Sequence, residues 1–289
     1  MQSRIQITAL IYLLLVFSVP DDAQAELIGY WDFDLSADDR SGNQVHGQLV
    51  GDAVFDTDVP PGVSSTHSIL LDGNGDWVAL GNPDALNFGS NDWTLVGWLN
   101  TTRTGLGDEN EGTVFGNGGD WTGGIRYTLV LSEGNIEGVP TLVIDDNAAP
   151  PGSSFNKQVL VASTAVNDGN WHHVAGVRAG GQMRIYVDGV MEGARSFNPS
   201  YDVTGIDQLP AYIGAITDNR DGQVFKNFDG RLDDIALWNE ALSAENIQAL
   251  ADGSVTPLSV PEPASITFAW LGLLGALRLR HNGFLMQEV

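Results

Sequence analysis

Short apolar runs, each bounded by Gly, Asn or Asp, recur at regular intervals between residues 26 and 240. Runs of this length suit strands better than the longer helices of globular proteins. We predict strands at 28–33, 68–71, 77–80, 94–99, 126–131, 141–144, 159–162, 171–177, 183–187, 211–213 and 232–238. Even spacing of this kind favours an antiparallel sandwich or barrel, and the lack of alternating long helices disfavours a parallel α/β sheet.

Turn residues and one helix signal divide the runs. The segment 72–76 (DGNGD) supplies glycines for positive φ, and we interpret it as a hairpin turn. Asp188 and Gly189 predict a second hairpin turn. Ser243 is a good N-cap for a helix over 244–251, which Asp252-Gly253 would end.

The N-terminal residues 1–25 have the pattern of a signal peptide. Arg4 precedes an apolar run over 9–19, and the small-residue site Ala23-Gln24-Ala25 follows. The run is shorter than the roughly 20 residues needed to span a bilayer. We therefore expect export, with a mature chain that begins at Glu26.

A second signal occupies the C-terminal end. Residues 260–263 read VPEP, an apolar run covers 264–277, and Arg278 and Arg280 follow. This arrangement resembles the PEP-CTERM sorting signal of Gram-negative bacteria. The resemblance implies transient inner-membrane association through the C-terminal helix until an exosortase cuts near the motif.

We assign 260–282 to this sorting signal and 254–259 to a polar linker before it. The tail 283–289 (GFLMQEV) departs from the family pattern, which usually stops just after the basic residues. A plain tail anchor is the alternative, because arginines after an apolar run also act as a stop-transfer signal.

Net charge limits the kinds of binding partner, and the cysteine content limits how the domain is stabilised. The formal net charge is −24 at pH 7, and such a surface repels phosphate backbones, so we expect no nucleic-acid partner. An acidic surface favours solubility and the binding of divalent cations. Cysteine is absent, so the domain cannot rely on disulfides although export would permit them. Its stability must come from a large core, to which a bound metal ion would add.

Several blocks in a fixed order carry a family resemblance. They are YWDFD (30–34), DRSGNQVHGQL (39–49), SILLDGNGDWVAL (68–80), DWTLVGWLN (92–100), DGNWHHVAGVRAGGQMRIYVDGVMEG (168–193) and FDGRLDDIALWNEALSAENIQAL (228–250). In this order they resemble the laminin-G-like jelly roll, part of the concanavalin-A-like lectin and glucanase fold. The resemblance implies an all-β domain over 26–253, a two-sheet antiparallel jelly-roll sandwich with one concave and one convex sheet. Short helices are expected only in the terminal signals and near 244–251.

The same family often holds a structural Ca²⁺ where its first and last strands meet. The matching positions here are Asp34, Asp39 and Asp233, with Asp234 adjacent. Carboxylate and carbonyl oxygens suit a hard cation and not zinc. The alternative is a set of aspartates that cap turns on an acidic surface. The segment 72–76 does not match an EF-hand, whose later Gly and Glu are missing.

Strand geometry predicts how the last strand presents its two aspartates. Side chains alternate between faces. Counting by two places Asp233 on the face of Ile235, and Asp234 on the face of Leu232 and Ala236.

Catalytic motifs are weak in this sequence. We find no G-x-S-x-G, H-E-x-x-H or P-loop, although a lyase that uses Tyr or His stays open. Glu133 and Glu137 come near the paired-glutamate strand of sugar-cleaving relatives, but Gly134-Asn135 between them reads as a hairpin turn. His172 and His173 are neighbours on a strand and point to opposite faces, so we assign them to packing or hydrogen bonding.

Loop aromatics are the best candidates for a sugar contact. Trp121 lies in the glycine-rich segment 116–124, and Asp120 and Arg126 beside it suit sugar hydroxyls. We therefore expect a non-catalytic module that binds carbohydrate, exopolysaccharide or extracellular matrix at the cell surface of a Gram-negative bacterium. The alternatives are a structural matrix protein with no specific ligand and a polysaccharide-active enzyme.

Overall fold

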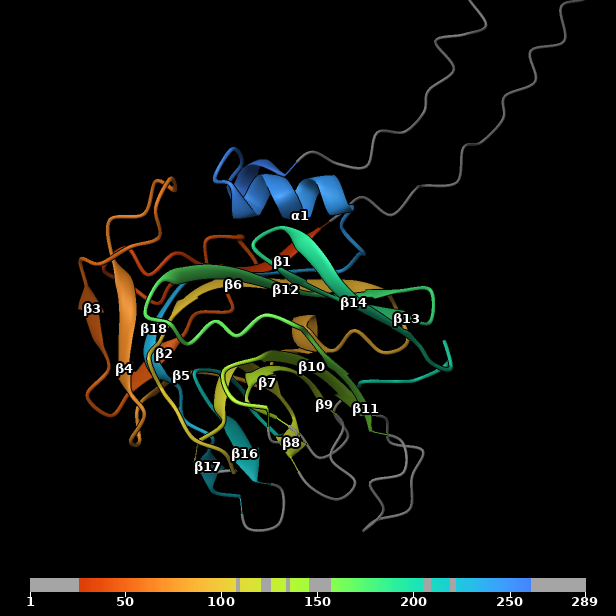
Figure 1. The fold of residues 1–289 in the computed structure, drawn as a ribbon, viewed down its shortest axis with the longest axis horizontal. Helices are drawn as coiled ribbons and strands as arrows, with labels where there is room; N and C mark the ends of the chain where they lie inside the picture. The colour runs from red at the N-terminus through yellow and green to blue at the C-terminus, as the bar shows by residue number, and fades with distance from the viewer. Residues whose placement is uncertain are drawn as a thin grey trace, which may run out of the picture.

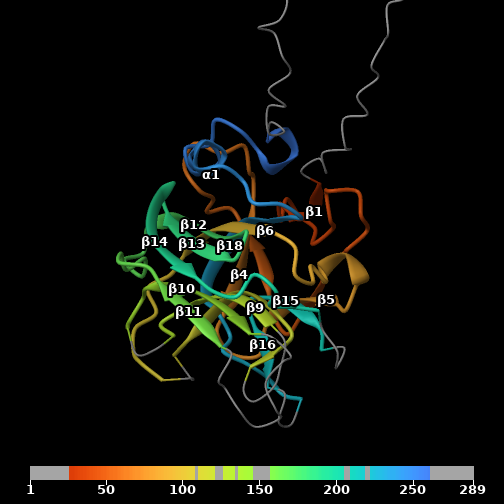
Figure 2. The same ribbon diagram turned by 90° about the vertical axis from the view of Figure 1, so that its right-hand side faces the viewer.

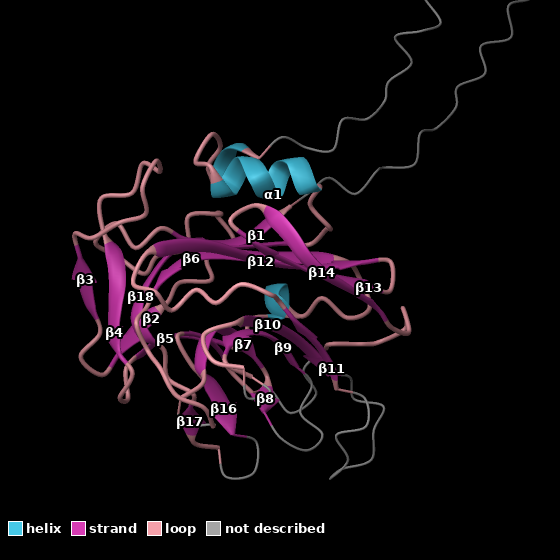
Figure 3. Cartoon of the chain, in the orientation of Figure 1, coloured by secondary structure: helices cyan, strands magenta, loops and turns pink. Residues whose placement is uncertain are grey.

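The computed structural model describes residues 26–107, 110–120, 126–133, 136–145, 157–204, 209–218 and 222–260. Their strands form two stacked antiparallel sheets with one short α-helix, which confirms the predicted all-β sandwich (Figures 1 and 3). The predicted signal peptide, the sorting signal beyond Val260 and the tail lie outside the described residues. Among the described helices, none combines the length and apolarity needed to cross a membrane.

The larger sheet has eight strands. Their order is β14 (Val190–Ser196), β13 (Gln182–Val187), β12 (Trp171–Ala179), β6 (Trp93–Asn100), β18 (Asp229–Trp238), β4 (Ser68–Asp72) and β3 (Val54–Asp56), with β1 (Leu27–Trp31) beside β18. The seven-stranded sheet has the order β11 (Gln158–Val161), β10 (Pro140–Asp145), β9 (Arg126–Leu131), β7 (Gly112–Asn117), β15 (Ala211–Ile213), β5 (Trp77–Gly81) and β2 (Gln48–Val50). A small third sheet contains β17 (Val224–Phe225), β16 (Ile216–Asp218) and β8 (Gly119–Asp120).

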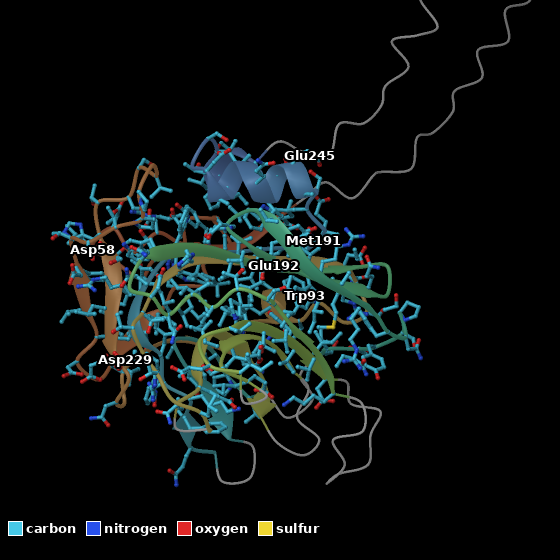
Figure 4. All side chains as sticks on the ribbon, in the orientation of Figure 1. Asp58, Trp93, Met191, Glu192, Asp229 and Glu245 are labelled. Atoms are coloured by element: carbon cyan, nitrogen blue, oxygen red, sulfur yellow. The ribbon has the colours of Figure 1, made fainter. Side chains whose placement is uncertain are left out.

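The main core fills the space between the two large sheets. Trp93 lies there, fully buried, and its ring centroid is 4.9 Å from that of Tyr127 (Figure 4). Phe115 stacks on the same tyrosine at 5.9 Å. Burying one large apolar side chain contributes roughly 1.5–3 kcal/mol. A core of this kind supplies the stability that disulfides cannot.

Helix α1 (Ala244–Ala251) covers the outer face of the eight-stranded sheet (Figure 2). The Ser243 hydroxyl oxygen accepts a hydrogen bond from the Asn246 backbone N–H at 3.2 Å, as the predicted N-cap requires. Ile247 and Leu250 bury their side chains against the sheet. The segment predicted as a linker also packs here, because it forms the 3₁₀ turn η2 (Pro257–Ser259) with Pro257 buried. A second 3₁₀ turn, η1 (Asp84–Leu86), lies before β6.

The two predicted hairpin turns have different outcomes. Asp188 and Gly189 both have positive φ and join β13 to β14 with Val187 opposite Val190, so this hairpin is confirmed. The interpretation of 72–76 as a hairpin is wrong, because β4 and β5 belong to different sheets. The segment instead arches from one sheet to the other. A side-chain bond closes the arch, from the Asp72 backbone N–H to the Asp76 Oδ2 at 2.8 Å.

A β-bulge interrupts β18 at its two aspartates. Asp233 is opposite Trp98 and Ala236 is opposite Val96, so two residues of β18 face the single residue Gly97. The predicted faces are therefore wrong for the residues before the bulge. Leu232 points into the main core. Asp233 consequently shares the outer face with Trp98, because paired residues lie on the same face.

Candidate functional site

Asp233 and Asp234, here called the strand pair, lie in the bulge, at the point where β18 changes its partner strand. The N-terminal part of β18 pairs with β4 and the C-terminal part pairs with β1. Asp234 adopts φ 48°, a left-handed conformation that Asp tolerates better than most residues. Its Oδ1 accepts a hydrogen bond from the Tyr30 hydroxyl at 2.5 Å, and its Oδ2 accepts one from the Ser65 hydroxyl at 3.4 Å.

Burial controls the charge of the strand pair. Burial, followed by repulsion from Asp234, raises the pKa of Asp233 to about 9. Burial also raises the pKa of Asp234 to about 6, against the lowering effect of the Tyr30 hydrogen bond. Burial and mutual repulsion therefore both disfavour the state in which the two carboxyl groups are charged together. Asp233 Oδ2 is buried and has no hydrogen-bond partner among the described residues.

Asp34 and Asp39, the other predicted cation ligands, have different roles. Asp34 Oδ1 accepts bonds from the backbone N–H groups of Thr66 and His67, at 2.7 and 3.0 Å. Its charge contributes to the raised pKa of both members of the strand pair, so it lies near them. Both carboxylate oxygens of Asp39 accept hydrogen bonds from backbone N–H groups. Oδ1 accepts one from Tyr30 at 3.0 Å, and Oδ2 accepts one from Val45 at 3.1 Å. Asp39 fixes a loop against β1, and its oxygens are already committed.

A cavity of about 240 Å³ lies beside the strand pair, between α1 and the eight-stranded sheet. It is lined by Gly62, Val63, Ser64, Val96, Trp98, His173, Asp234, Leu250, Gly253, Val255, Thr256 and Pro257. Exposed Ser64 is part of this lining, so the cavity reaches the surface. A Cβ on Gly253 would lie 2.4 Å from the Gly62 carbonyl oxygen, so the wall requires glycine at position 253. Sequence reasoning missed this cavity because its lining comes from distant segments.

An aromatic pair forms part of the cavity wall. Trp98 and His173 meet edge to face, with ring centroids 5.3 Å apart. Burial lowers the pKa of His173 to about 4, so its ring is neutral at pH 7. Nδ1 of His173 has no hydrogen-bond partner among the described residues. His172 instead contacts the carboxylates of Asp168 and Asp188, which confirms that the two histidines serve opposite faces.

The predicted sugar-contact residues fall where side chains are not described. Trp121 lies outside the described residues. Asp120 belongs to β8 and Arg126 to β9, where the backbone of Arg126 is opposite Asp145, and only their backbones are placed.

The paired glutamates of the near-miss motif do not share a strand. Strands β9 and β10 pair antiparallel and the segment between them contains both glutamates, but the predicted turn residues Gly134 and Asn135 lie outside the described residues. Glu133 forms ion pairs with Lys157 and with Lys226, the latter at 3.4 Å, whereas Glu137 is exposed. Lys226 also pairs with buried Glu111, whose pKa burial raises to about 7.

A second acidic cluster lies where two connections cross between the sheets. Asp52, Asp72 and Asp76, here called the rim triad, each offer a carboxylate oxygen, and these oxygens lie within 4.8 Å of one another. Across the described part of the chain, no other set of three or more acidic, His or Cys ligands meets this criterion. Such a group can hold a metal ion. The predicted set of Asp34, Asp39, Asp233 and Asp234 does not converge in this way.

Sequence comparison identifies relatives of this chain. The sequence model of the family described as "Concanavalin A-like lectin/glucanases superfamily" matches residues 72–248. A mouse protein named "Sushi, von Willebrand factor type A, EGF and pentraxin domain-containing protein 1" is 29% identical over 109 residues, which are 36% of this chain. The match spans only 3% of that protein's length.

Solved structures with a similar fold include several binding domains. Domain 4 of AbnA, an extracellular arabinanase from Geobacillus stearothermophilus, was solved with arabinotriose and is 18% identical. It aligns with 79% of this chain and 99% of its own length at a TM-score of 0.57. The binding domain of Paraclostridial Mosquitocidal Protein 1 is 16% identical, with a TM-score of 0.59 over 79% of this chain and 52% of its own. The receptor binding domain of a botulinum neurotoxin C/D mosaic serotype, also 16% identical, gives 0.57 over 79% and 51%. At these identities the likeness establishes the fold.

Proposed function

The chain belongs to the concanavalin A-like lectin/glucanases superfamily, and from this premise we propose that it is a non-catalytic module that binds carbohydrate outside the cell. The cavity beside the strand pair is the observation that carries this proposal. Its volume of about 240 Å³ is below the roughly 300–1,000 Å³ of pockets for drug-sized ligands. It suits one small unit, such as the terminal ring of a glycan, better than an internal stretch of polysaccharide.

The chemistry of the lining supports a sugar. Trp98 offers an aromatic surface for the apolar side of a sugar ring, and Val96 continues that surface. Ser64, Thr256 and Asp234 supply hydroxyl and carboxylate groups for sugar hydroxyls. A few polar groups in an otherwise apolar cavity give a ligand its orientation.

A glycan array with the exported chain tests the proposal. We expect binding to a defined set of glycan ends, and we expect Ser64→Trp to abolish it by filling the cavity. Leu258→Trp is the matched control, because Leu258 is 62% exposed in the neighbouring segment and does not line the cavity. Binding that survives Ser64→Trp would move the site to another surface. An array without any binding would favour the structural matrix protein.

Absence of catalysis is part of the same proposal. Glu133 forms ion pairs with two lysines and Glu137 is exposed, an arrangement that supports a structural role for the near-miss motif. We expect no reducing sugar to be released from any polysaccharide that the array identifies. Release that is lost in Glu133→Gln would make the chain an enzyme.

A structural Ca²⁺ of the kind that the fold family implies fits only some of the predicted residues. Asp233 Oδ2 is buried without a partner among the described residues and Asp34 and Asp234 lie near it, so Asp233 would be the first ligand, but the oxygens of these three residues do not converge as those of the rim triad do. Asp39 does not fit, because backbone N–H groups occupy its oxygens. The ion would neutralise the charge of the strand pair where the edge of β18 changes partner. We expect Ca²⁺ to raise the melting temperature. Asp233→Asn should remove the share of that increase that comes from the strand pair.

Export and sorting complete the proposal. Residues 1–25 would be removed as a signal peptide, and an exosortase would cut near 260–263 after a transient stay in the inner membrane. The product would reside at the cell surface or in the extracellular matrix. The intact mass of the mature protein from its native host tests both cuts, and a mass that retains 264–277 would favour a tail anchor.

A further inference from the structure

We propose that the rim triad of Asp52, Asp72 and Asp76 is a Ca²⁺ site that clamps two crossings between the sheets. The triad is separate from the cavity and from the strand pair. Two different connections supply its members: Asp52 follows β2, and Asp72 and Asp76 lie at the two ends of the arch between β4 and β5.

Both connections pass from one sheet to the other. Strand β2 belongs to the seven-stranded sheet and β3 to the eight-stranded one, while β4 and β5 reverse that order. The two turns lie in close contact, because a Cβ on Gly51 would be 2.4 Å from the Gly75 carbonyl oxygen. An ion bound by both turns would therefore tie the sheets together at this rim.

A buried oxygen without a partner marks the position of the ion. Asp76 is only 1% exposed, and its Oδ1 has no hydrogen-bond partner within the described residues. Its other oxygen is occupied by the Asp72 backbone N–H. An unpaired carboxylate oxygen in the interior is costly, and a cation removes that cost. The oxygen belongs to a group that already faces two further carboxylates within 4.8 Å.

The ligand chemistry selects a hard cation. The triad contains oxygen ligands alone, which suit Ca²⁺ and Mg²⁺ better than Zn²⁺. Oxygens bound to Ca²⁺ lie 2.3–2.6 Å from the ion, so ligand atoms up to about 5 Å apart can share it. The turns supply their ligands at irregular positions. Ca²⁺ accepts such geometry, whereas Mg²⁺ demands a near-ideal octahedron.

Titration calorimetry of the full chain with CaCl₂ tests the site. We expect a binding event with a dissociation constant in the range of roughly 10⁻⁴–10⁻³ M that is typical of extracellular modules. Asp52→Asn and Asp76→Asn should each weaken it about 10-fold or more. Asp52 is exposed, so its variant should fold normally even if Asp76→Asn does not.

Two variants separate this site from other calcium binding. Glu245→Gln removes one exposed charge on α1 (Figure 4), an element that supplies no member of the triad, and should leave the affinity unchanged. Asp233→Asn should also retain the triad event, which distinguishes it from calcium at the strand pair. The proposal is overturned if the wild-type chain binds no Ca²⁺ at 10 mM (about ten times the upper end of that range), if Asp52→Asn binds as wild type does, or if Zn²⁺ binds this site more tightly than Ca²⁺.

Discussion

The strand pair and the rim triad are both clusters of aspartates, yet the fold builds them in opposite ways. The strand pair lies within one strand, where Asp233 is fully buried and Asp234 is 9% exposed. The rim triad joins two turns, and two of its three members are exposed. In the first cluster, burial decides whether a carboxyl group keeps its proton. In the second, water screens Asp52 and Asp72, and only Asp76 carries the cost of burial.

This difference teaches what each cluster needs from its neighbours. In the strand pair, Tyr30 and Ser65 donate hydrogen bonds to Asp234, whereas Asp233 Oδ2 has no donor in the described part of the chain. The rim triad has backbone donors for some of its oxygens and leaves Asp76 Oδ1 without one. Each cluster has one buried oxygen without a partner, but only the rim triad brings three carboxylate oxygens within 4.8 Å of one another, as a shared cation requires.

The pH dependence of stability is the largest effect that we expect. The pKa of Asp233 is about 9 in the folded state and near 4 when unfolded, so the folded state binds the additional proton. Its stabilisation is complete below about pH 4 and is lost as the pH rises toward 9. In chelator, the free energy of unfolding should fall by about 2–5 kcal/mol between pH 5 and pH 9. Urea titrations at each pH measure it.

Asp233→Asn is the matched variant for this measurement, because asparagine resembles the protonated acid in shape. We expect it to flatten the decline while it keeps the acceptor for the Asp234 backbone N–H. Equal slopes in the wild-type chain and the variant would contradict the raised pKa. Asp52→Asn should leave the slope as it is, since Asp52 is exposed.

Two glycines at the rim give the next effect. Gly51 has φ 75° and little space for a Cβ, whereas Gly75 has φ 86° and open space around it. Gly75→Ala should cost about 1–2 kcal/mol for the left-handed conformation alone. Gly51→Ala should cost about 2–4 kcal/mol, because overpacking adds to that strain. Chemical denaturation in chelator compares them, and equal costs would mean that the two turns separate easily when no ion is bound.

Single carboxylates give the last comparison, and Asp52 gives the smallest effect. Asp234→Ala should cost about 1–3 kcal/mol, because it leaves the buried Tyr30 hydroxyl without its acceptor. Asp52→Ala should stay within about 0.5 kcal/mol in chelator, as exposed substitutions do. Tyr30→Phe provides the control by a double-mutant cycle: in its presence the cost of Asp234→Ala should shrink. An undiminished cost would mean that the hydrogen bond contributes little.

Regular strands were readily predicted because period and turn residues are local properties. The predicted run at 126–131 is a strand with the same bounds, and the helix at 244–251 begins after its predicted cap. Strand β14 was missed, since its sequence VMEGARS is mostly exposed and lacks a clear apolar alternation. Pairing with β13 holds β14 in the sheet. The sequence of β14 alone carries no signal of that pairing.

The candidate sites were less accessible to sequence reasoning. Counting by two failed at Asp233, because the bulge inserts a residue that no local pattern announces. The segment 72–76 was correctly identified as a turn with positive φ at its glycines, but its strands went to different sheets. Asp52 joins that segment only through the packing of a second turn. A Gly-Asp pair at 51–52 was the single available signal.

The sequence by itself therefore determined the class of fold, eleven of the strands, the capped helix and the acidic surface. These follow from alternation, turn chemistry and charge, which act over a few residues. The tertiary structure alone decided which carboxylates meet, which of them lose water, and where a cavity remains beneath α1. Those outcomes depend on the register between strands and on contacts between distant turns, because burial and proximity are properties of the packed chain and not of any one segment.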